Sequence, residues 1–587
     1  MIDRSSGDSQ LLGQIFFRRV QELGETTFVR LQRKGRFEEV SWNDFGAMVR
    51  GTLLGLYSLG LRKGERVGIL SENRLEWLCA DIATLAGGLP NVIVSPRLSE
   101  NMILKVFGNS RPRAVFVEDE SGAGRLLNLK GQLPFLDYLI VMDSMTAPLP
   151  NAIDLDELLR RGRRGEDNRI GEIMESIHPE DLATIMYTSG STGEPKGVMR
   201  TQKNMLSNIT CGMELTLSKP DELFVIVLSL NHLLGRFGFL KSAVTGRSTA
   251  IVESTELEVD LKAIQVLSPT AMTLVPRVMQ RILAGLLADV KIRNSWEAIE
   301  ELEQTKEEAG ALGADQIGKY DELRSSLRKE VSLSLGGRIK YISYSGAPMA
   351  PRIMRFFEVA GIPLIGSYGS TECGGVSLSG LKDNRPGSCG KPFPNVEVRI
   401  AGDGEILVRG PTVTPGYFEN PQATAEALDS EGWFHTGDLG LTDPDGSLRI
   451  IGRKKDVFYC TDGSNIYPGY IELLLENDPF IRQGILLGDH LPFMAALIVP
   501  ERARMAAELK KEEESLASAE IERLLWSRIE IINGQLEEVE KIRKIAVIER
   551  DFSERVRSVT AFQKIKVDRK AVAESYRQEI ARIYQAA

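Results

Sequence analysis

The sequence predicts an α/β protein: a large N-terminal domain of mixed and parallel sheets layered with helices, a β-rich subdomain, and a small α+β domain at the C-terminus. Short Val/Ile/Leu runs alternate with helical patterns over the first 180 residues, which is typical of parallel sheet covered by helices. Near residue 390 the pattern changes to alternation around tight turns. The 587 residues, 42% hydrophobic and 26% charged, have ordinary globular composition and allow about four compact units or fewer large ones.

The first region begins with an amphipathic helix over residues 42–61 and a buried strand over 66–70. A second helix is expected over 77–87, because its apolar positions recur at helical spacing. Further buried strands are predicted at 114–117, 138–142, 223–228 and 249–252.

The later elements change in character. Residues 296–329 are rich in Glu, Lys, Ala and Leu without an internal Pro, and predict charged surface helix. Strands at 396–400 and 405–409 flank a Gly-Asp-Gly turn, which is the pattern of a hairpin. Another strand is expected at 447–451.

The last part of the chain predicts a small α+β domain. Strands are expected at 485–487 and 497–499, and Leu525, Ile529 and Ile532 mark one face of a helix that continues to Leu536. The charged run between two strands at 452–456 reads as a solvated face on composition alone. The expected domains are a large one over 1–452 with its β-rich part at 390–452, a hinge at 453–456, and a small one over 457–587.

Charge and rare residues exclude several function classes. The net charge is 72 − 81 = −9, so a general nucleic-acid binder is disfavoured. The five cysteines form no CxxC pair, which favours a reducing compartment, and four histidines argue against a His-rich metal site. No apolar run follows Met1, and the apolar stretch 485–499 is interrupted by Gly, Asp, His and Pro. We expect a soluble cytoplasmic protein with at most transient contact with membrane surfaces.

The segment at 187–197 (YTSGSTGEPKG) carries the clearest chemistry. It follows an apolar strand and combines three Gly, four hydroxyl side chains of Ser and Thr, and one Lys, which are groups that bind polyphosphate oxygens. An ordinary Ser/Gly surface turn is the alternative, but such turns rarely hold this density of hydroxyls beside a Lys. The loop is not a Walker A motif, because Pro195 precedes Lys196 and Gly197 follows it, and no GxGxxG follows a strand.

Together with four later segments, this loop resembles the adenylate-forming superfamily of acyl-CoA synthetases, nonribosomal adenylation domains and luciferases. The four segments are 345–348 (SGAP), 368–372 (YGSTE), 433–438 (WFHTGD) and 452–456 (GRKKD). Five motifs in the family's order, from about residue 40 to the C-terminus, are unlike a chance match. Within the family the chain is most similar to bacterial long-chain fatty acyl-CoA synthetases, at residues 229–232 (SLNH), 273–277 (TLVPR), 335–338 (LGGR) and 383–387 (DNRPG).

The resemblance implies a two-step reaction, in which a carboxylate attacks the α-phosphorus of ATP and a thiol then displaces AMP from the acyl-AMP. It implies ATP, Mg²⁺ and coenzyme A as cosubstrates and cofactors. Positioning and electrostatics would supply most of the acceleration, because an anion attacks a polyanion.

By position in the family's motifs, the resemblance also implies residue roles. Lys196 would hold the β- and γ-phosphates together with Thr188, Ser189, Gly190, Ser191, Thr192 and Gly193. Tyr368 would stack on adenine against a wall formed by Gly346, Ala347 and Pro348, with Gly369 beside it. Thr371 would meet the α-phosphate, Glu372 would bind Mg²⁺, and Asp438 and Arg453 would contact the ribose.

Four further sites follow from the same resemblance. His232 would border the acyl pocket and the carboxylate, although a lone His among leucines is more often a core residue. The catalytic lysine would be Lys566, ten residues before Tyr576, but the family's usual lead-in is absent and Lys564 remains open. Lys455 would stand at the hinge. The loop lining the thiol tunnel would contain Tyr459, Gly463, Ser464 and Asn465, with Asp462 in place of a family Gly.

The function expected from the sequence is therefore an AMP-forming ligase of a long-chain fatty acid with coenzyme A. The near alternatives load an acyl carrier protein or use a medium-chain or aromatic acid, since discrimination per methylene is only about 1–3 kcal/mol. The alternative from another class is a non-catalytic protein that binds ATP or an acyl group. Fatty acid, ATP and coenzyme A are the expected partners, without nucleic acid.

Overall fold

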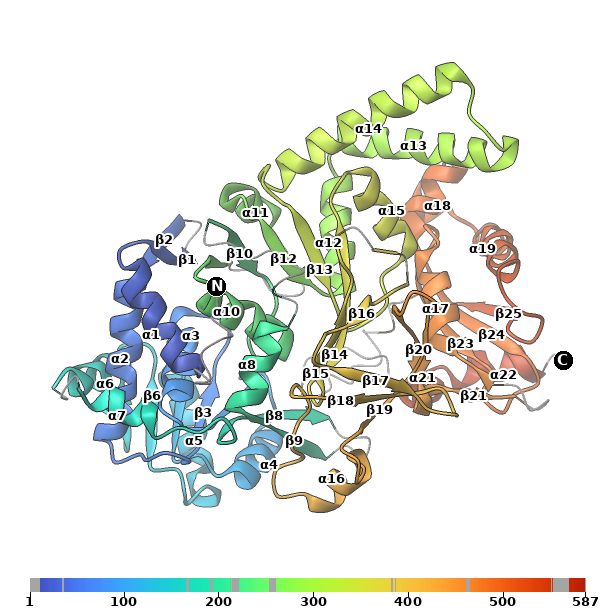
Figure 1. The fold of residues 1–587 in the computed structure, drawn as a ribbon. Helices are drawn as coiled ribbons and strands as arrows, with labels where there is room; N and C mark the ends of the chain where they lie inside the picture. Colours follow the sequence, from blue (N-terminus) through green and yellow to red (C-terminus); the bar gives the residue numbers. More distant parts are fainter. Residues whose placement is uncertain are drawn as a thin grey trace. The chain divides into compact units, whose positions relative to one another are not determined.

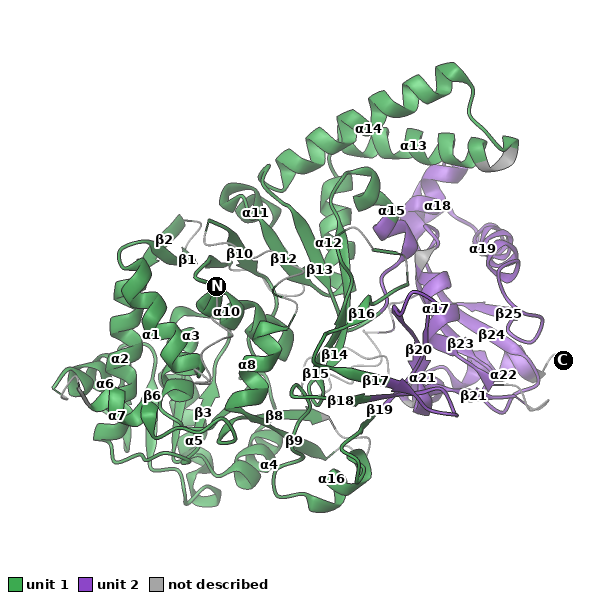
Figure 2. Cartoon of the chain, in the orientation of Figure 1, with its two compact units in different colours: residues 1–347, 355–398, 408–435 green, residues 348–354, 399–407, 436–587 purple. Residues whose placement is uncertain are grey.

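The computed structural model describes residues 11–33, 36–164, 168–189, 194–211, 213, 221–252, 260–381, 384–385, 387–460, 465–549, 552 and 569–585. It divides into two compact units (Figure 2), unit 1 with residues 1–347, 355–398 and 408–435, and unit 2 with residues 348–354, 399–407 and 436–587. The expected domain boundary at 452 and the hinge at 453–456 stay predictions.

A seven-stranded sheet in unit 1 has the order β7-β6-β5-β3-β4-β8-β9, parallel except for the final β8–β9 pair. Its strands are β3 (Val67–Leu70), β4 (Asn91–Val94), β5 (Ala114–Val117), β6 (Tyr138–Val141), β7 (Ala152–Asp154), β8 (Leu182–Ser189) and β9 (Pro195–Thr201). The accompanying helices are α3 (Leu75–Ala86), α4 (Glu100–Ser110), α5 (Glu120–Leu129), α6 (Leu155–Arg163), α7 (Asn168–Glu175) and α8 (Gln202–Thr210). Strands β3, β4 and β5 are buried at every position, which confirms the expectation of parallel sheet covered by helices.

A nine-stranded sheet completes the framework of unit 1, in the order β16-β15-β14-β13-β12-β10-β11-β1-β2, with parallel pairing at its centre (Figure 1). Its strands are β1 (Thr27–Arg33), β2 (Arg36–Ser41), β10 (Leu223–Ile226), β11 (Ser248–Ile251), β12 (Ala271–Leu274), β13 (Tyr341–Tyr344), β14 (Leu364–Ser370), β15 (Gly374–Leu378) and β16 (Lys391–Pro392). The helices near it are α1 (Leu12–Leu23), α2 (Trp42–Ser58), α10 (Leu233–Thr245), α11 (Leu261–Leu267), α12 (Pro276–Leu287) and α15 (Pro351–Val359).

An aromatic cluster forms part of the core of unit 1. The rings of Phe28 and Trp42 stack with centroids 3.8 Å apart, and Phe16, Phe45 and Phe239 surround them. All five side chains are buried. Helix α2 begins at Trp42 because Ser41 caps it, its hydroxyl accepting from the Asp44 N–H at 3.0 Å.

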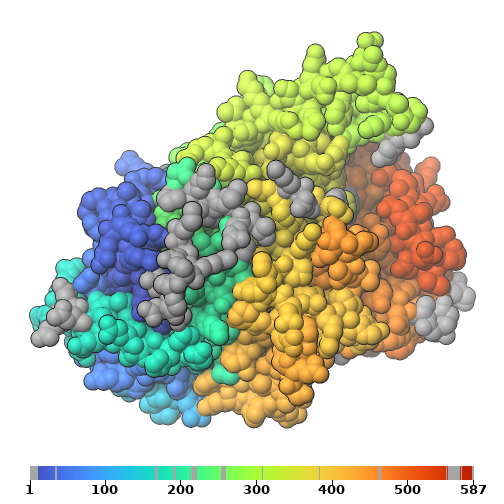
Figure 3. All heavy atoms as spheres, viewed as in Figure 1, coloured from blue at the N-terminus to red at the C-terminus, as the bar shows by residue number. Residues whose placement is uncertain are grey.

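The charged helix expected at 296–329 is confirmed, except that it is interrupted at residues 310–313. Two helices, α13 (Val290–Ala309) and α14 (Ala314–Ser334), pack side by side and form the yellow-green ridge in Figure 3. The helix breaks because Gly310 adopts a left-handed φ of +77°, which ends α13, and α14 restarts after Gly313.

A buried charged network joins helices α3 and α10 to the seven-stranded sheet of unit 1. The guanidinium of Arg236 on α10 binds the carboxylate of Asp81 on α3 through Nη2–Oδ1 at 2.6 Å and Nε–Oδ2 at 3.0 Å, with both side chains fully buried. Arg236 also donates to Asn91 on β4 and to Thr184 on β8. The network fixes the helix that begins after His232 to the strand that leads into the 187–197 segment.

A four-stranded sheet has the order β17-β18-β19-β20, and its strands contribute residues to both units. These strands are β17 (Glu397–Ile400), β18 (Glu405–Arg409), β19 (Phe434–Thr442) and β20 (Leu448–Arg453), and helix α16 (Pro421–Ala427) lies between β18 and β19 in sequence. The hairpin expected around residues 402–404 is confirmed.

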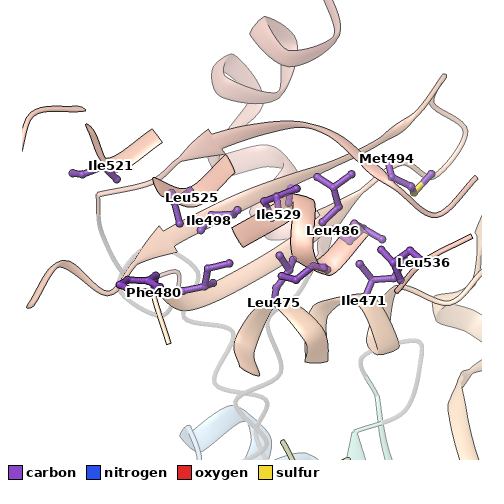
Figure 4. Packing of buried hydrophobic residues seen from close by; sticks show 14 of the residues in the cluster. Ile471, Leu475, Phe480, Leu486, Met494, Ile498, Ile521, Leu525, Ile529 and Leu536 are labelled. Atoms are coloured by element: carbon purple, nitrogen blue, oxygen red, sulfur yellow. The ribbon is translucent and has the colours of Figure 1, made fainter. Parts of the chain in front are cut away.

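The remainder of unit 2 is a mixed sheet, β23-β24-β25, packed with helices around an apolar core on one face and a second apolar cluster on the other. Its elements are β21 (Phe458–Tyr459), β22 (Asn465–Ile466), α17 (Pro468–Asn477), β23 (Ile481–Leu487), β24 (Met494–Pro500), α18 (Arg502–Leu509), α19 (Ser518–Asn533), β25 (Ile542–Val547), α21 (Arg569–Ser575) and α22 (Arg577–Gln585). Leu475, Ile498, Leu525 and Ile529 meet in that core (Figure 4), so the apolar face expected of residues 525–536 is confirmed, although α19 ends at Asn533. None of the described helices is long and apolar enough to cross a membrane.

Candidate active site

The hairpin of β8 and β9 presents two of the expected phosphate-binding residues. Thr188 pairs with Lys196 in the antiparallel ladder, and Ser189 pairs with Pro195. Gly190, Ser191, Thr192 and Gly193 lie outside the described residues. The described part therefore places a hydroxyl and an ammonium side chain on neighbouring strands at the end of the hairpin.

The carboxylate of Glu372 accepts hydrogen bonds from two hydroxyl groups. Thr188 Oγ1 donates to Glu372 Oε1 at 3.4 Å, and the phenol of Tyr417 donates to the same oxygen at 3.5 Å. The ring of Tyr417 faces Lys196, whose Nζ lies 5.1 Å from the ring centroid. Four residues that are distant in sequence thus form one polar cluster in unit 1, here called the Glu372 cluster: Thr188, Lys196, Glu372 and Tyr417.

The backbone around Glu372 is fixed from β9. The carbonyl of Glu372 accepts from the Thr414 N–H at 2.8 Å and from Arg200 Nη1 at 3.4 Å. Arg200 also donates to the Thr412 carbonyl at 2.6 Å, and its side chain is fully buried. Burial lowers the pKa of Arg200 to about 10, and its Nε and Nη2 find no partner among the described residues.

Close backbone contacts also shape the turn after Glu372. Gly374 has a φ of +65°, and a Cβ there would lie 2.0 Å from Asn208 Oδ1 and 2.6 Å from Arg200 Nη2. Gly369 lies close enough to it that a Cβ would meet the Gly374 carbonyl oxygen at 2.1 Å. Both positions therefore require glycine, and the turn that carries Thr371 and Glu372 is held in one conformation.

The expected adenine wall lies at the ends of two parallel strands in unit 1. Tyr368 is nearly buried on β14, and Gly346 and Ala347 follow β13. The strand ends are joined because Ser345 Oγ donates to the Ser367 carbonyl and Ser367 Oγ donates to the Tyr344 carbonyl, each at 3.0 Å. Gly346 has a φ of +89°, and Pro348 follows Ala347 in the chain.

His232 begins helix α10 as its N-cap residue, and its side chain is partly buried. The preceding loop is fixed by Asn231, which donates to the Ser71 carbonyl at 3.0 Å, and by Asn73, which accepts from the Leu230 N–H at 2.7 Å. His232 therefore stands at the start of a helix with a well-supported entry, which suits a residue that lines a pocket.

In unit 2, Asp438 and Arg453 face each other. They are direct partners in the β19–β20 ladder, and Arg453 Nε lies 2.9 Å from Asp438 Oδ1. Asp438 is buried except for 5% of its surface, whereas Arg453 is exposed. A carboxylate held in this way by a guanidinium can accept hydrogen bonds from a vicinal diol.

The residues predicted for the hinge and the thiol tunnel come directly after Arg453 in the sequence. Lys455 lies in a short 3₁₀ turn at Lys454–Asp456, where Lys454 pairs with Asp403 at 2.6 Å and with Glu405 at 3.1 Å. Tyr459 is 53% exposed and pairs with Asn465 between β21 and β22. Asp462, Gly463 and Ser464 lie outside the described residues.

Lys564 and Lys566 also lie outside the described residues, but both flanks of that stretch are anchored in unit 2. Before it, the Phe552 N–H donates to Gln483 Oε1 at 3.0 Å. After it, Arg569 Nη2 binds Glu472 Oε2 at 2.6 Å and its guanidinium lies 5.1 Å from the Phe458 ring centroid. The chain thus enters and leaves this stretch at fixed points.

Two residues of the site were not singled out from the sequence, Tyr417 and Arg200. Tyr417 follows a Gly in the β-rich region and meets Glu372 across 45 residues of chain. Arg200 looks like an ordinary polar position at the end of a strand. The sequence offers two signals for these residues: the Pro-Gly-Tyr sequence at 415–417, and an Arg directly after the apolar pair at 198–199.

Two family models match the chain. One, described as AMP-binding enzyme, matches residues 16–418, and the other, described as AMP-binding enzyme C-terminal domain, matches residues 455–587. The long-chain-fatty-acid–CoA ligase FadD15 of Mycobacterium bovis is 31% identical over 583 residues, covering 96% of this chain and 95% of that protein. Fatty acyl-CoA synthetase A of Dictyostelium discoideum is 30% identical over 502 residues, covering 80% of this chain and 73% of that protein.

Solved structures share the fold at lower identity. The anthranilate CoA ligase AuaEII in complex with anthranoyl-AMP matches with a TM-score of 0.75 at 18% identity, covering 97% of this chain and 98% of that one. ATP-bound MatB from Rhodopseudomonas palustris matches with a TM-score of 0.70 at 20% identity, covering 97% and 99%. With both family models matched in order along the sequence, the chain belongs to the adenylate-forming superfamily of AMP-binding enzymes, as an AMP-forming acyl-activating ligase.

Proposed function

We propose that this ligase activates a long-chain fatty acid and transfers the acyl group to coenzyme A. The observation that carries the proposal is the similarity to the FadD15 ligase over 96% of the chain at 31% identity. The family as a whole implies ATP, an acid and coenzyme A as substrates. The similarity to a long-chain ligase supports the finer assignment of the acid.

The reaction has two balanced steps. A carboxylate oxygen attacks the α-phosphorus of ATP, the bond to the β-phosphate bridge breaks, and acyl-AMP and pyrophosphate form. The sulfur of coenzyme A then attacks the carbonyl carbon, the bond from that carbon to the bridging oxygen breaks, and AMP leaves as the thiol proton is lost. Orientation of two anionic reactants is the main demand on the protein in the first step.

The Glu372 cluster suits a hard divalent cation. Mg²⁺ is usually held by one or two carboxylates, with phosphate oxygens and water filling the other positions. The described residues contain no group of three or more His, Cys, Asp or Glu side chains that could hold a metal by themselves. A single carboxylate beside the phosphate-binding hairpin fits this pattern, and Mg²⁺ bound there would screen the charge of the polyphosphate.

In this proposal, different residues of the chain bind different parts of the substrates. Lys196, Thr188 and the rest of the 188–193 loop hold the β- and γ-phosphates, and Thr371 meets the α-phosphate. Tyr368 and the 346–348 segment, with Gly369, hold adenine, and Asp438 and Arg453 hold the ribose. His232 borders the carboxylate and the acyl chain, while Tyr459, Gly463, Ser464 and Asn465 border the pantetheine thiol.

Lys566 is the residue proposed to bind the acid carboxylate and the α-phosphate during adenylation, with Lys564 as the alternative. Lys455 would stand at the pivot between the expected large domain (1–452) and small domain (457–587), which would change orientation between the steps. Lys566→Ala should depress acid-dependent ATP–pyrophosphate exchange by about 100-fold or more, while thiol transfer from preformed acyl-AMP changes little. Lys564→Ala is the matched variant, and the reverse pattern between the two would assign the role to Lys564.

A panel of acids tests the function. Acids from short to long chain, with an aromatic acid included, are supplied with ATP and either coenzyme A or a carrier protein bearing phosphopantetheine. The highest kcat/KM is expected for a long chain with coenzyme A. Preference for an aromatic or short acid, or transfer only to the carrier protein, would replace the proposal by that alternative. ATP binding without exchange for any acid would favour a non-catalytic binding protein.

A further inference from the structure

Tyr417 stands between the two charged groups of the Glu372 cluster. It lies beyond β9, where the Phe418 N–H donates to the Gly197 carbonyl at 2.7 Å and the Met199 N–H donates to the Gly416 carbonyl at 3.1 Å. Its ring is 8% exposed, and its N–H donates to Thr424 Oγ1 at 2.9 Å. The backbone therefore gives the phenol a fixed position against the phosphate-binding hairpin.

Its hydroxyl acts on the carboxylate. The phenol donates to Glu372 Oε1 at 3.5 Å, the same oxygen that Thr188 approaches at 3.4 Å. Both distances exceed the range of about 2.5–3.0 Å that is usual for O–H···O hydrogen bonds, so each contact by itself is weak. Together the two hydroxyl groups restrict the rotation of the carboxylate.

Its ring acts on the ammonium. Lys196 Nζ lies 5.1 Å from the ring centroid, within the range of a cation–π contact. A long Lys side chain loses rotamer entropy when it binds a phosphate, so a ring that already restricts it lowers that entropic cost. The one side chain thus orients a carboxylate through its edge and a cation through its face.

We propose that Tyr417 is a positioning residue for MgATP, which orients Glu372 toward the metal ion and Lys196 toward the phosphates. The inference rests on the proposed function of the Glu372 cluster. The two contacts of Tyr417 come from different parts of the side chain, so they can be removed separately. The alternative is that Tyr417 only packs its own 414–418 segment against β9, without orienting Glu372 or Lys196.

The experiment measures ATP binding by isothermal titration calorimetry over a series of Mg²⁺ concentrations, for the full chain and two variants. Tyr417→Phe removes the hydroxyl and keeps the ring. It should raise the Mg²⁺ concentration needed for half of the full ATP affinity by about 3- to 10-fold, less than a short hydrogen bond to an ionised group would give. ATP affinity at saturating Mg²⁺ should stay within about 2-fold of the wild type.

Tyr417→Leu removes both contacts. It should show the same shift in Mg²⁺ dependence and, in addition, a loss of about 2- to 5-fold in ATP affinity at saturating Mg²⁺, the size of a partly exposed cation–π contact. The matched control is Tyr57→Phe. Tyr57 is a buried residue on helix α2, and the variant removes its hydroxyl, which donates to the Gly87 carbonyl at 2.9 Å. That variant should lose stability and keep the wild-type Mg²⁺ dependence.

An unchanged Mg²⁺ dependence in Tyr417→Phe would overturn the proposal. If Tyr417→Leu fails to fold, the Tyr417→Phe result alone decides. If Tyr417→Phe and Tyr417→Leu lower the melting temperature equally and neither changes nucleotide binding, Tyr417 has a packing role only. The proposed function is tested separately, since a wild-type chain that binds MgATP but supports no acid-dependent exchange would refute the ligase assignment and leave the binding result for Tyr417 intact.

Discussion

Replacement of Arg236 by Met should destabilise unit 1 by about 3–5 kcal/mol, because it leaves the carboxylate of Asp81 buried without its cation. The loss follows from the contacts: two charge-assisted hydrogen bonds to Asp81 at 2.6 and 3.0 Å disappear, and the donors to Asn91 and Thr184 disappear with them. Among the residues that the structure describes, only the amide of Asn91, at 2.9 Å, would still donate to the carboxylate.

The double variant Asp81→Leu with Arg236→Met separates charge from packing. It removes both ions, so it should be at least about 2 kcal/mol more stable than Arg236→Met alone. Urea unfolding followed by tryptophan fluorescence measures the difference, since Trp77 is buried on the same helix as Asp81. The Arg236→Met enzyme should also show a raised KM for the acid, because α10 begins after His232.

Two outcomes would refute this reasoning. A loss below about 1 kcal/mol in Arg236→Met would mean that the carboxylate is not confined by the surrounding structure. A double variant as unstable as the single one would mean that the damage comes from packing and not from an uncompensated charge.

Two further predictions concern the turn after Glu372 and the anchor of the C-terminal region. Gly374→Ala should abolish most adenylation activity and lower the melting temperature, because its Cβ would overlap Asn208 and Arg200 at a left-handed φ; near-normal exchange activity would contradict this. Burial raises the pKa of Glu472, partly offset by Arg569, so the folded state binds a proton more readily than the unfolded state there. Relative to Glu472→Gln, the wild type should therefore become more stable as pH falls from 7 toward 5, measured by thermal unfolding at each pH; parallel profiles would contradict the raised pKa.

Much of the framework could be predicted from local pattern. The strand at 67–70 was recognisable because it is apolar at each position, and it is buried on both faces of a parallel sheet. The composition of residues 296–329 predicts helix, but it does not reveal the break at Gly310, whose left-handed φ ends α13.

In the site as well, some residues could be predicted from the sequence and others could not. Glu372 and Lys196 carry recognisable motifs, but their common neighbour Tyr417 does not, because its role depends on contacts made across the fold. The buried charge of Arg200 likewise depends on the 412–414 segment folding against β9. Residue type and spacing predict which groups could bind a nucleotide, whereas the groups that orient them become visible only in three dimensions.

An isotope experiment tests the central claim most directly. The acid is supplied with ¹⁸O in both carboxylate oxygens, together with ATP and coenzyme A, and the released AMP is analysed by mass spectrometry. If the carboxylate attacks the α-phosphorus, AMP acquires a single ¹⁸O atom from the acid and pyrophosphate acquires none. Unlabelled AMP, or release of ADP with labelled phosphate, would contradict activation of the acid as an acyl-adenylate.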